Sequence, residues 1–242
     1  MIVIPDLHGR LDLLELVLAA YPLENYLFLG DLIDRGGQIP ATVARVVDLM
    51  RRNRARLVWG NHEVMAMLAL ERFEDHTYKD LWLQNGGDQT LAQYSTTYQL
   101  DPALLGEHLK FITDSGRDYL IEDGVLYAHA SRPTADTIAH VNAGEAGQDD
   151  NHLWDRIELD KLRPLPEGVT LSVHGHTPQR SGQPLIDLDA GVIILDLGWW
   201  TSRIAVFDSR DHSVRVLDKL DTPVQLMPAR PTRSSGLILG GS

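Results

Sequence analysis

The chain has 242 residues, of which 43% are hydrophobic and 23% charged, as is usual for a globular protein with one or two domains. Its net charge of −12 argues against nucleic-acid binding, and the absence of cysteine excludes disulfides, zinc–thiolate sites and cysteine nucleophiles. No apolar run approaches the roughly 20 residues of a membrane span, and we see no signal peptide. We therefore expect a cytoplasmic protein with no nucleic-acid and no membrane partner, in which any metal is held by nitrogen and oxygen.

The first third of the chain alternates short apolar runs with helical patterns. Strands are predicted over residues 1–4, 26–29 and 56–59, and helices over 11–20, 41–52 and 64–71. Gly30 and Gly60 close the second and third strands, and Pro40 stands near the start of the second helix. This alternation predicts an α/β fold with a mainly parallel sheet.

The rest of the chain is less regular. Residues 78–113 have a helical, loop-rich pattern, and the polar stretch 134–150 is predicted to be a surface loop. The pair Asp123-Gly124 is typical of a β-hairpin turn. Strands are predicted on both sides of it, at 119–122 and 125–128, and again at 170–173, 192–195, 203–208 and 214–217. We expect a single domain over residues 1–227, followed by a mobile tail at 228–242 that is rich in Pro, Ser and Gly.

Polar clusters follow five of the predicted strands. The clusters are Asp6-Leu7-His8, Asp31 to Arg35, Asn61-His62-Glu63, His129, and His174-Gly175-His176. Each fragment alone is more often a turn, a helix cap or a core histidine than a site. Ligands of open α/β sheets sit at the carboxyl ends of strands, and all five clusters offer nitrogen or oxygen donors there. Together they predict a metal site at one edge of the sheet.

These clusters resemble the GDxHG, GDxxDRG and GNHE signatures of the phosphoprotein phosphatase (PPP) family, within the calcineurin-like metallophosphoesterases. The chain is most like the serine/threonine phosphatases of the bacterial and lambda-phage type. The likeness extends from residue 2 to about 207 and includes NGG at 85–87, HASRP at 129–133, WDR at 154–156 and GHTP at 175–178. It implies a layered metallophosphoesterase fold, with two mixed β-sheets flanked by helices, and makes residues 1–227 the catalytic domain.

The resemblance also implies a centre of two divalent metal ions. Its implied ligands are Asp6, His8, Asp31, Asn61, His129 and His176. By the same resemblance Asp31 bridges the two ions, a role that suits a carboxylate, whose two oxygens can span cations about 3.5–4 Å apart. We expect manganese, with iron, zinc or nickel as alternatives, because nitrogen and oxygen ligands discriminate poorly among these metals.

The implied reaction is an in-line attack on phosphorus by a hydroxide that bridges the metals, with no covalent phospho-enzyme. Arg35 and Arg156 are the candidates to bind phosphate oxygens, since a guanidinium can grip two of them. His62 is the candidate general acid, and Asp34 would orient it. The role of His174 stays open among lining the site, a supporting hydrogen bond and packing.

The expected activity is hydrolysis of phosphomonoesters, with phosphoserine and phosphothreonine proteins or peptides, phosphotyrosine, or a small phosphate ester as substrate. Hydrolysis of a dinucleoside polyphosphate such as diadenosine tetraphosphate is the alternative on the same scaffold. A catalytically silent binding module and a haloacid-dehalogenase-type phosphatase, which would use the DxD at 187–189, are less favoured. Two residues depart from the family pattern: Pro5 replaces a glycine, and Trp59 stands where arginine is common. The oligomeric state is not predicted.

Overall fold

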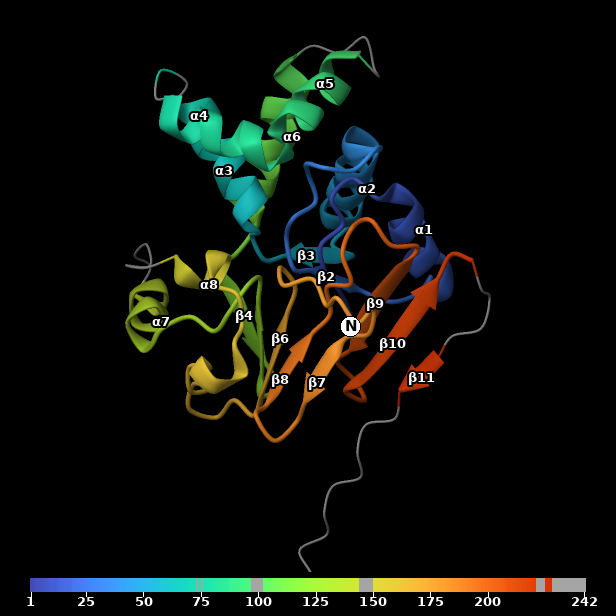
Figure 1. The fold of residues 1–242 in the computed structure, drawn as a ribbon, viewed down its shortest axis with the longest axis vertical. Helices are drawn as coiled ribbons and strands as arrows, with labels where there is room; N and C mark the ends of the chain where they lie inside the picture. The colour runs from blue at the N-terminus through green and yellow to red at the C-terminus, as the bar shows by residue number, and fades with distance from the viewer. Residues whose placement is uncertain (73, 75, 97–101, 144–149, 221–224, 228–242) are drawn as a thin grey trace, which may run out of the picture.

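The computed structural model describes residues 1–72, 74, 76–96, 102–143, 150–220 and 225–227 (Figure 1). The tail predicted at 228–242 lies outside these residues. Within the described part of the chain, no helix combines the length and the apolar character needed to cross a bilayer.

The first β-sheet has the strand order β11-β10-β9-β1-β2-β3. Its strands are β1 (Ile2–Ile4), β2 (Tyr26–Phe28), β3 (Ala55–Leu57), β9 (Arg203–Asp208), β10 (Ser213–Asp218) and β11 (Gln225–Met227). The strands β1, β2 and β3 are parallel, as the alternation of strands and helices predicts. The strand β9 pairs antiparallel with β1, and β10 and β11 continue antiparallel, so the sheet as a whole is mixed rather than mainly parallel.

The second β-sheet has the order β4-β5-β6-β8-β7. Its strands are β4 (Tyr119–Glu122), β5 (Val125–Ala128), β6 (Leu171–His174), β7 (Leu185–Asp187) and β8 (Val192–Ile194). The inner strands β5, β6 and β8 are parallel, and the edge strands β4 and β7 are antiparallel to their neighbours. The Asp123-Gly124 hairpin between β4 and β5 is confirmed.

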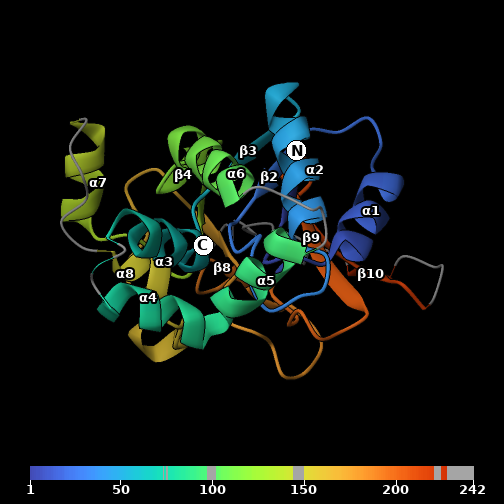
Figure 2. The same cartoon turned by 90° about the horizontal axis from the view of Figure 1, so that it is seen from above.

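Helices flank the two sheets (Figures 1 and 2). They are α1 (Leu11–Ala20), α2 (Ile39–Arg51), α3 (Asn61–Glu71), α4 (His76–Trp82), α5 (Asp88–Thr96), α6 (Pro102–Ser115), α7 (Ala135–Asn142) and α8 (Asn151–Trp154). The helices α3 to α6 gather at one end of the molecule, while α1 and α2 lie together beside the first sheet. Short turns occupy Leu83–Gly87 and Leu159–Lys161.

Alternation along the strands produces two hydrophobic layers. In β1, Ile2 and Ile4 pack with α1 and α2 in one core, whereas Val3 packs in a second core between the sheets. In β9, Ile204 and Phe207 likewise belong to different cores. Because successive side chains of a strand point to opposite faces, the first sheet is buried on both sides. The layered arrangement of two mixed sheets and flanking helices confirms the expected fold class.

The prediction of a surface loop over 134–150 was wrong in its first half, where the chain forms α7. The side chain of Thr134 accepts a hydrogen bond from the amide of Thr137 at 3.1 Å and so caps the helix. Asp136 lies in the first turn, where a negative charge favours the helix dipole. Residues 144–149 lie outside the described chain.

Candidate metal centre

The loops that follow β1 and β2 are joined by backbone hydrogen bonds. The amides of Leu7 and His8 donate to the carbonyl of Asp31 at 3.0 and 2.8 Å, and the amide of Gly9 donates to Leu32 at 2.8 Å. Three backbone amides that follow Pro5 therefore hold the loop after β1 against the loop after β2. The loop is held in this way without the backbone N–H that proline lacks.

Backbone conformations at this edge are strained. Five non-glycine residues of the polar clusters have positive φ: His8 (44°), Asp31 (51°), Asp34 (67°), Arg35 (66°) and His176 (59°). Each such conformation costs on the order of 1–3 kcal/mol and persists only where the surrounding structure enforces it. Strain of this kind clusters at functional sites, where it aims side chains that a relaxed turn would direct elsewhere.

Asp31 stands between two groups of imidazoles. Its Oδ2 lies 3.5 Å from Nε2 of His8 and 3.8 Å from Nε2 of His62, whereas its Oδ1 lies 3.4 Å from Nε2 of His129. Two sets of potential ligands result, His8-Asp31-His62 and Asp31-His129-His176, and the ligand atoms within each set lie within 4.8 Å of one another. The carboxylate is shared by both sets.

Hydrogen bonds fix which ring nitrogens are free to bind a metal. Nδ1 of His8 lies 2.8 Å from the carbonyl of Ile33, and Nδ1 of His129 lies 2.6 Å from that of Leu29. A carbonyl can only accept, so both Nδ1 atoms carry the proton and both Nε2 atoms keep a lone pair. A histidine that binds a metal usually donates its other nitrogen to such a partner.

The same reasoning applies to His176. Its Nε2 donates to the carbonyl of Trp154 at 3.0 Å, which leaves Nδ1 as an acceptor. This Nδ1 lies 3.2 Å from both Oδ1 of Asn61 and Nε2 of His129, and the latter two atoms are 3.0 Å apart. Three atoms that can only accept thus converge with no proton between them, an arrangement that a bound cation would stabilise. The donor set fits a metal ion.

Burial favours the uncharged form of the candidate histidine ligands, which is the form that binds a metal ion. It lowers the pKa of His8 and His129 well below the usual value and that of His176 to about 4, so all three rings are neutral near pH 7. Burial also raises the pKa of Asp31 well above its usual range, with further contributions from the nearby charges of Asp6 and Glu63. Neutral imidazoles around crowded carboxyl groups favour binding of a positive ion.

Asp6 lies at the border of this arrangement. Its Oδ1 accepts the amide of His176 at 2.9 Å, and its Oδ2 is 3.9 Å from Nε2 of His8. It lies outside the two sets of mutually close ligand atoms, and His62 occupies the corresponding place in the first set. Asp6 and His8, both expected as ligands, are therefore neighbours, but only His8 belongs to one of the two sets.

His62 is hydrogen-bonded to Asp34, the residue that the sequence-based hypothesis pairs with it. Its Nδ1 lies 2.6 Å from Oδ2 of Asp34, which also accepts from Nε1 of Trp82 at 3.1 Å. The Thr90 hydroxyl donates to the other Asp34 oxygen at 2.5 Å. Burial lowers the pKa of His62 well below its usual value and raises that of Asp34 to about 7, so burial disfavours the charged form of each partner.

The two candidate phosphate-binding arginines differ in position. Arg35 is half-buried, and its Nη1 donates to Nε2 of His8 at 3.1 Å, so it reaches the centre. Arg156 is exposed just beyond α8, and its charge lowers the pKa of His176. Arg35 thus points at the candidate ligands, and Arg156 stands at their rim.

Two residues left open by the sequence do not enter the centre. His174 is fully buried and its Nδ1 lies 3.0 Å from the carbonyl of Ala128, while its Nε2 has no hydrogen-bond partner among the described residues. Trp59 turns away, with its Nε1 3.4 Å from the carbonyl of Ile112 at the end of α6. The family's usual arginine position is therefore used here for packing against α6.

Asp196 and Glu63 are buried acids to which sequence reasoning gave no role. Glu63 accepts the amides of Asp31 and Leu32, both at 2.8 Å, and so supports the loop that carries the shared carboxylate. Asp196 is 3% exposed, and burial together with the charge of Asp196 raises the pKa of Asp6. A signal for Asp196 was available, because it follows β8, a strand parallel to β6, at the same carboxyl edge.

Known proteins resemble this chain in sequence and in fold. The family model for calcineurin-like phosphoesterases matches residues 1–180. The serine/threonine-protein phosphatase PP2A-like PPG1 of Saccharomyces cerevisiae is 34% identical over 192 residues, which cover 76% of this chain and 44% of the yeast protein. The match thus spans less than half of that relative.

Solved structures agree on the fold. A protein serine/threonine phosphatase from Saccharomyces cerevisiae, with similarity to human phosphatase PP5, superimposes with a TM-score of 0.62 at 14% identity, covering 92% of this chain and 80% of that one. A putative diadenosine tetraphosphatase gives a TM-score of 0.55 at 16% identity, covering 90% of this chain and 92% of that one. The family and the histidine–aspartate clusters together indicate divalent metal ions. The chain belongs to the calcineurin-like metallophosphoesterases, with PPP-type phosphatases among its relatives.

Proposed function

We propose that this chain is a two-metal phosphomonoesterase that hydrolyses phosphoserine and phosphothreonine in proteins. The observation that carries the proposal is the position of Asp31, whose Oδ2 faces His8 at 3.5 Å and whose Oδ1 faces His129 at 3.4 Å. A carboxylate with one oxygen toward each of two imidazole groups is suited to bridge two ions. The serine/threonine phosphatase name of the 34% identical relative supports the substrate class.

The ligands in this proposal are the six residues implied by the sequence, namely Asp6, His8, Asp31, Asn61, His129 and His176. Divalent ions bound there, with manganese as our first choice over iron, zinc and nickel, would lower the pKa of a coordinated water and polarise the phosphoryl oxygens. The buried acids and neutral imidazoles supply the negative charge and the lone pairs that such ions need.

The remaining steps fall to the chain's own side chains. Arg35, now hydrogen-bonded to His8, would turn its guanidinium to the phosphoryl oxygens, and Arg156 would hold them from the rim. His62 would donate a proton from Nε2 to the leaving alkoxide, and the 2.6 Å bond between its Nδ1 and Asp34 would hold the ring in the productive orientation and stabilise the imidazolium that carries this proton. Trp82 and Thr90 fix Asp34 in turn.

A comparison of substrates tests the proposal. We would measure kcat/KM on phosphoserine, phosphothreonine and phosphotyrosine peptides, on diadenosine tetraphosphate and on p-nitrophenyl phosphate, with the manganese-loaded chain. The proposal expects phosphoserine or phosphothreonine peptides to give higher values than diadenosine tetraphosphate. Efficient hydrolysis of diadenosine tetraphosphate with no turnover of phosphopeptides would overturn the substrate class in favour of the alternative. Phosphotyrosine turnover defines the breadth of the specificity.

A further inference from the structure

A pocket of about 310 Å³ includes Arg156, whose charge acts on the candidate ligand His176. Its wall includes Ser131, two residues after His129, and Arg156, two residues after Trp154. The carbonyl of Trp154 accepts from His176 at 3.0 Å, so both ends of this wall continue directly into the candidate ligands. Two short stretches of chain therefore connect the pocket to the centre.

The pocket is basic, although the chain carries a net charge of −12. Four basic residues line it, against two acidic ones. Both acids are already engaged: Asp155 Oδ2 lies 2.6 Å from Nη2 of Arg163, and Glu158 Oε2 lies 2.5 Å from Nζ of Lys161. The other two basic residues, Arg132 and Arg156, form no ion pair with a described carboxylate.

Arg132 is the more unusual of the two, because its side chain is buried. It is 3% exposed, and its described hydrogen bonds go to neutral oxygens, among them Oγ of Ser172 at 2.9 Å and the carbonyl of Gly191 at 2.9 Å. Burial lowers the pKa of this guanidinium to about 10, so it remains charged near pH 7. A buried cation without a counter-charge is costly, and an anion in the adjoining pocket would reduce that cost.

We propose that this pocket binds a second anionic group of a phosphopeptide substrate, a carboxylate or a further phosphate a few residues from the scissile one. The inference rests on the proposed function and deepens it by naming the substrate class. Arg163 and Lys161 already bind carboxylates of this chain, those of Asp155 and Glu158, so the pocket can bind a carboxylate group. Lys161 pairs at the surface with an exposed glutamate, so a substrate acid can compete for it.

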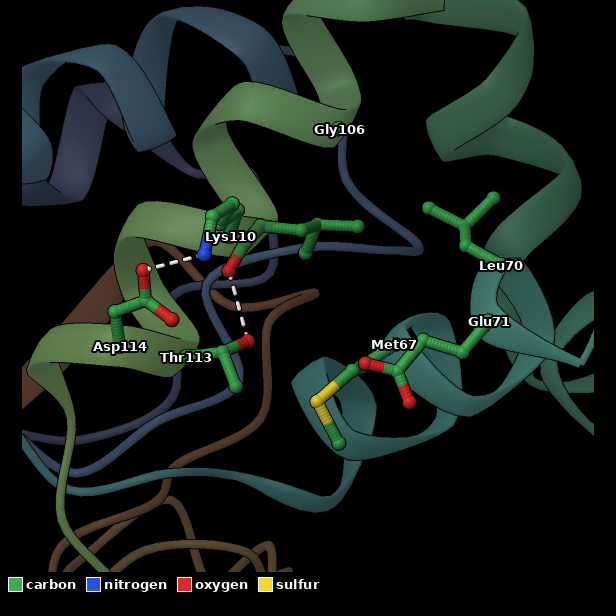
Figure 3. A pocket seen from close by; sticks show the side chains of 8 residues that line it. Met67, Leu70, Glu71, Gly106, Lys110, Thr113 and Asp114 are labelled. Carbon is green, nitrogen blue, oxygen red and sulfur yellow. Dashed lines mark hydrogen bonds and ion pairs between the residues drawn. The ribbon is translucent and has the colours of Figure 1, made fainter.

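The chain offers a matched control at another pocket. A second pocket, of about 270 Å³, lies between α3 and α6 and contains Lys110 hydrogen-bonded to Asp114 (Figure 3). The side chains of Lys110 and Lys161 are 76% and 69% exposed, and each pairs with an acid on its own helix or turn. Replacing either lysine by glutamine changes the net charge equally, but only Lys161 lies in the basic pocket.

The test compares phosphoserine peptides that differ at one position, carrying Glu, phosphoserine or Gln at several offsets from the scissile residue. At the best offset we expect the unaltered chain to favour an anionic peptide over its Gln counterpart by about fivefold in kcat/KM, as one partly exposed ion pair allows. K161Q should reduce this preference to about twofold or less, and E158Q, which removes the competing acid, should increase it. K110Q and D114N should keep the anion preference of the unaltered chain. None of the four substitutions should change the rate of p-nitrophenyl phosphate hydrolysis.

Three outcomes would count against the inference. Phosphopeptide hydrolysis with no anion preference at any offset, or a preference that K161Q and K110Q reduce equally, would overturn the subsite but leave the proposed function standing. No phosphopeptide hydrolysis at all, with turnover of p-nitrophenyl phosphate retained, would overturn both. A preference for Glu over phosphoserine, or the reverse, identifies which anion the pocket prefers and supports the subsite in either case.

Discussion

Five carboxyl groups are buried around the candidate metal centre, and none is more than 8% exposed: Asp6, Asp31, Asp34, Glu63 and Asp196. Burial raises the pKa of each of them, to about 7 for Asp34 and about 6 for Asp196. Without a cation, the folded chain therefore holds protons on these groups that the unfolded chain would have released. We conclude that metal binding and proton release are linked at this centre.

Asp196 gives a direct prediction of pH dependence. Its pKa rises from the usual 3.8 to about 6 on folding, so its ionisation lowers the stability of the metal-free fold as pH rises from about 4 to above 6. In Asp196→Asn this penalty is absent. We expect the metal-free variant to be more stable than the unaltered chain at pH 7.5, by up to about 3 kcal/mol, and to lose that advantage at pH 4.

Urea unfolding of both proteins in a chelator, at the two pH values, measures this difference. Asparagine keeps an oxygen that can accept the amide of Gly198, now 2.7 Å from Oδ1 of Asp196. An advantage of the same size at pH 4 and pH 7.5 would show that the gain has another origin than ionisation.

For individual residues, short sequence motifs were enough to predict which side chains come together. Asp31, Asn61, His129 and His176 lie far apart in the chain yet meet within a few ångströms. Residues that support the candidate ligands from elsewhere in the chain were not predictable from a local motif. Thr90 holds Asp34 across 56 positions, from a helix whose packing is not encoded in the motif itself.

Among the secondary-structure elements, the buried strands and long amphipathic helices were predictable. The helix over 11–20 and the strands over 119–122 and 125–128 were predicted with the observed bounds. The edge strand β7 (Leu185–Asp187) was missed, because three half-exposed residues give no clear alternation. α7 was missed because the glycines at 144 and 147 and the polar composition outweighed its Thr134 cap.

Tight contact between two loops requires glycine at position 36, directly after the second polar cluster. A Cβ on Gly36 would come 1.8 Å from the carbonyl oxygen of His8, whereas a Cβ on Gly37 would meet nothing within 4 Å. Because backbone atoms cannot yield as a flexible side chain can, Gly36→Ala must displace the loop of His8. We expect it to lower the free energy of unfolding by about 2 kcal/mol or more, and Gly37→Ala to stay within about 0.5 kcal/mol.

Paired denaturation curves of the two alanine variants test this expectation, with metal content measured on the same samples. Since Gly36 contacts the loop of a candidate ligand, its variant should also bind metal more weakly. Equal stabilities for the two variants would mean that the loops do not approach as closely as described.

For the whole molecule, the two stacked sheets bring the candidate ligands together. Asp6, Asp31 and Asn61 follow strands of the first sheet, and His129 and His176 follow strands of the second. The core between the sheets, which includes Val3 and Val173, sets the distance between these two groups. Metal ions held by both sheets would bind the folded chain and not the unfolded one, and would stabilise it accordingly.

The most direct test of the two-metal account is the number of manganese ions bound per chain, measured after chelation and reloading, with hydrolysis of p-nitrophenyl phosphate followed in parallel. The account predicts two ions for the unaltered chain, inactivity after chelation and recovery on reloading. It predicts fewer ions and a large loss of activity for Asp31→Asn. For His62→Ala it predicts two ions with a large loss of turnover. Two ions and full activity in Asp31→Asn, or undiminished hydrolysis by the chelated chain, would contradict it.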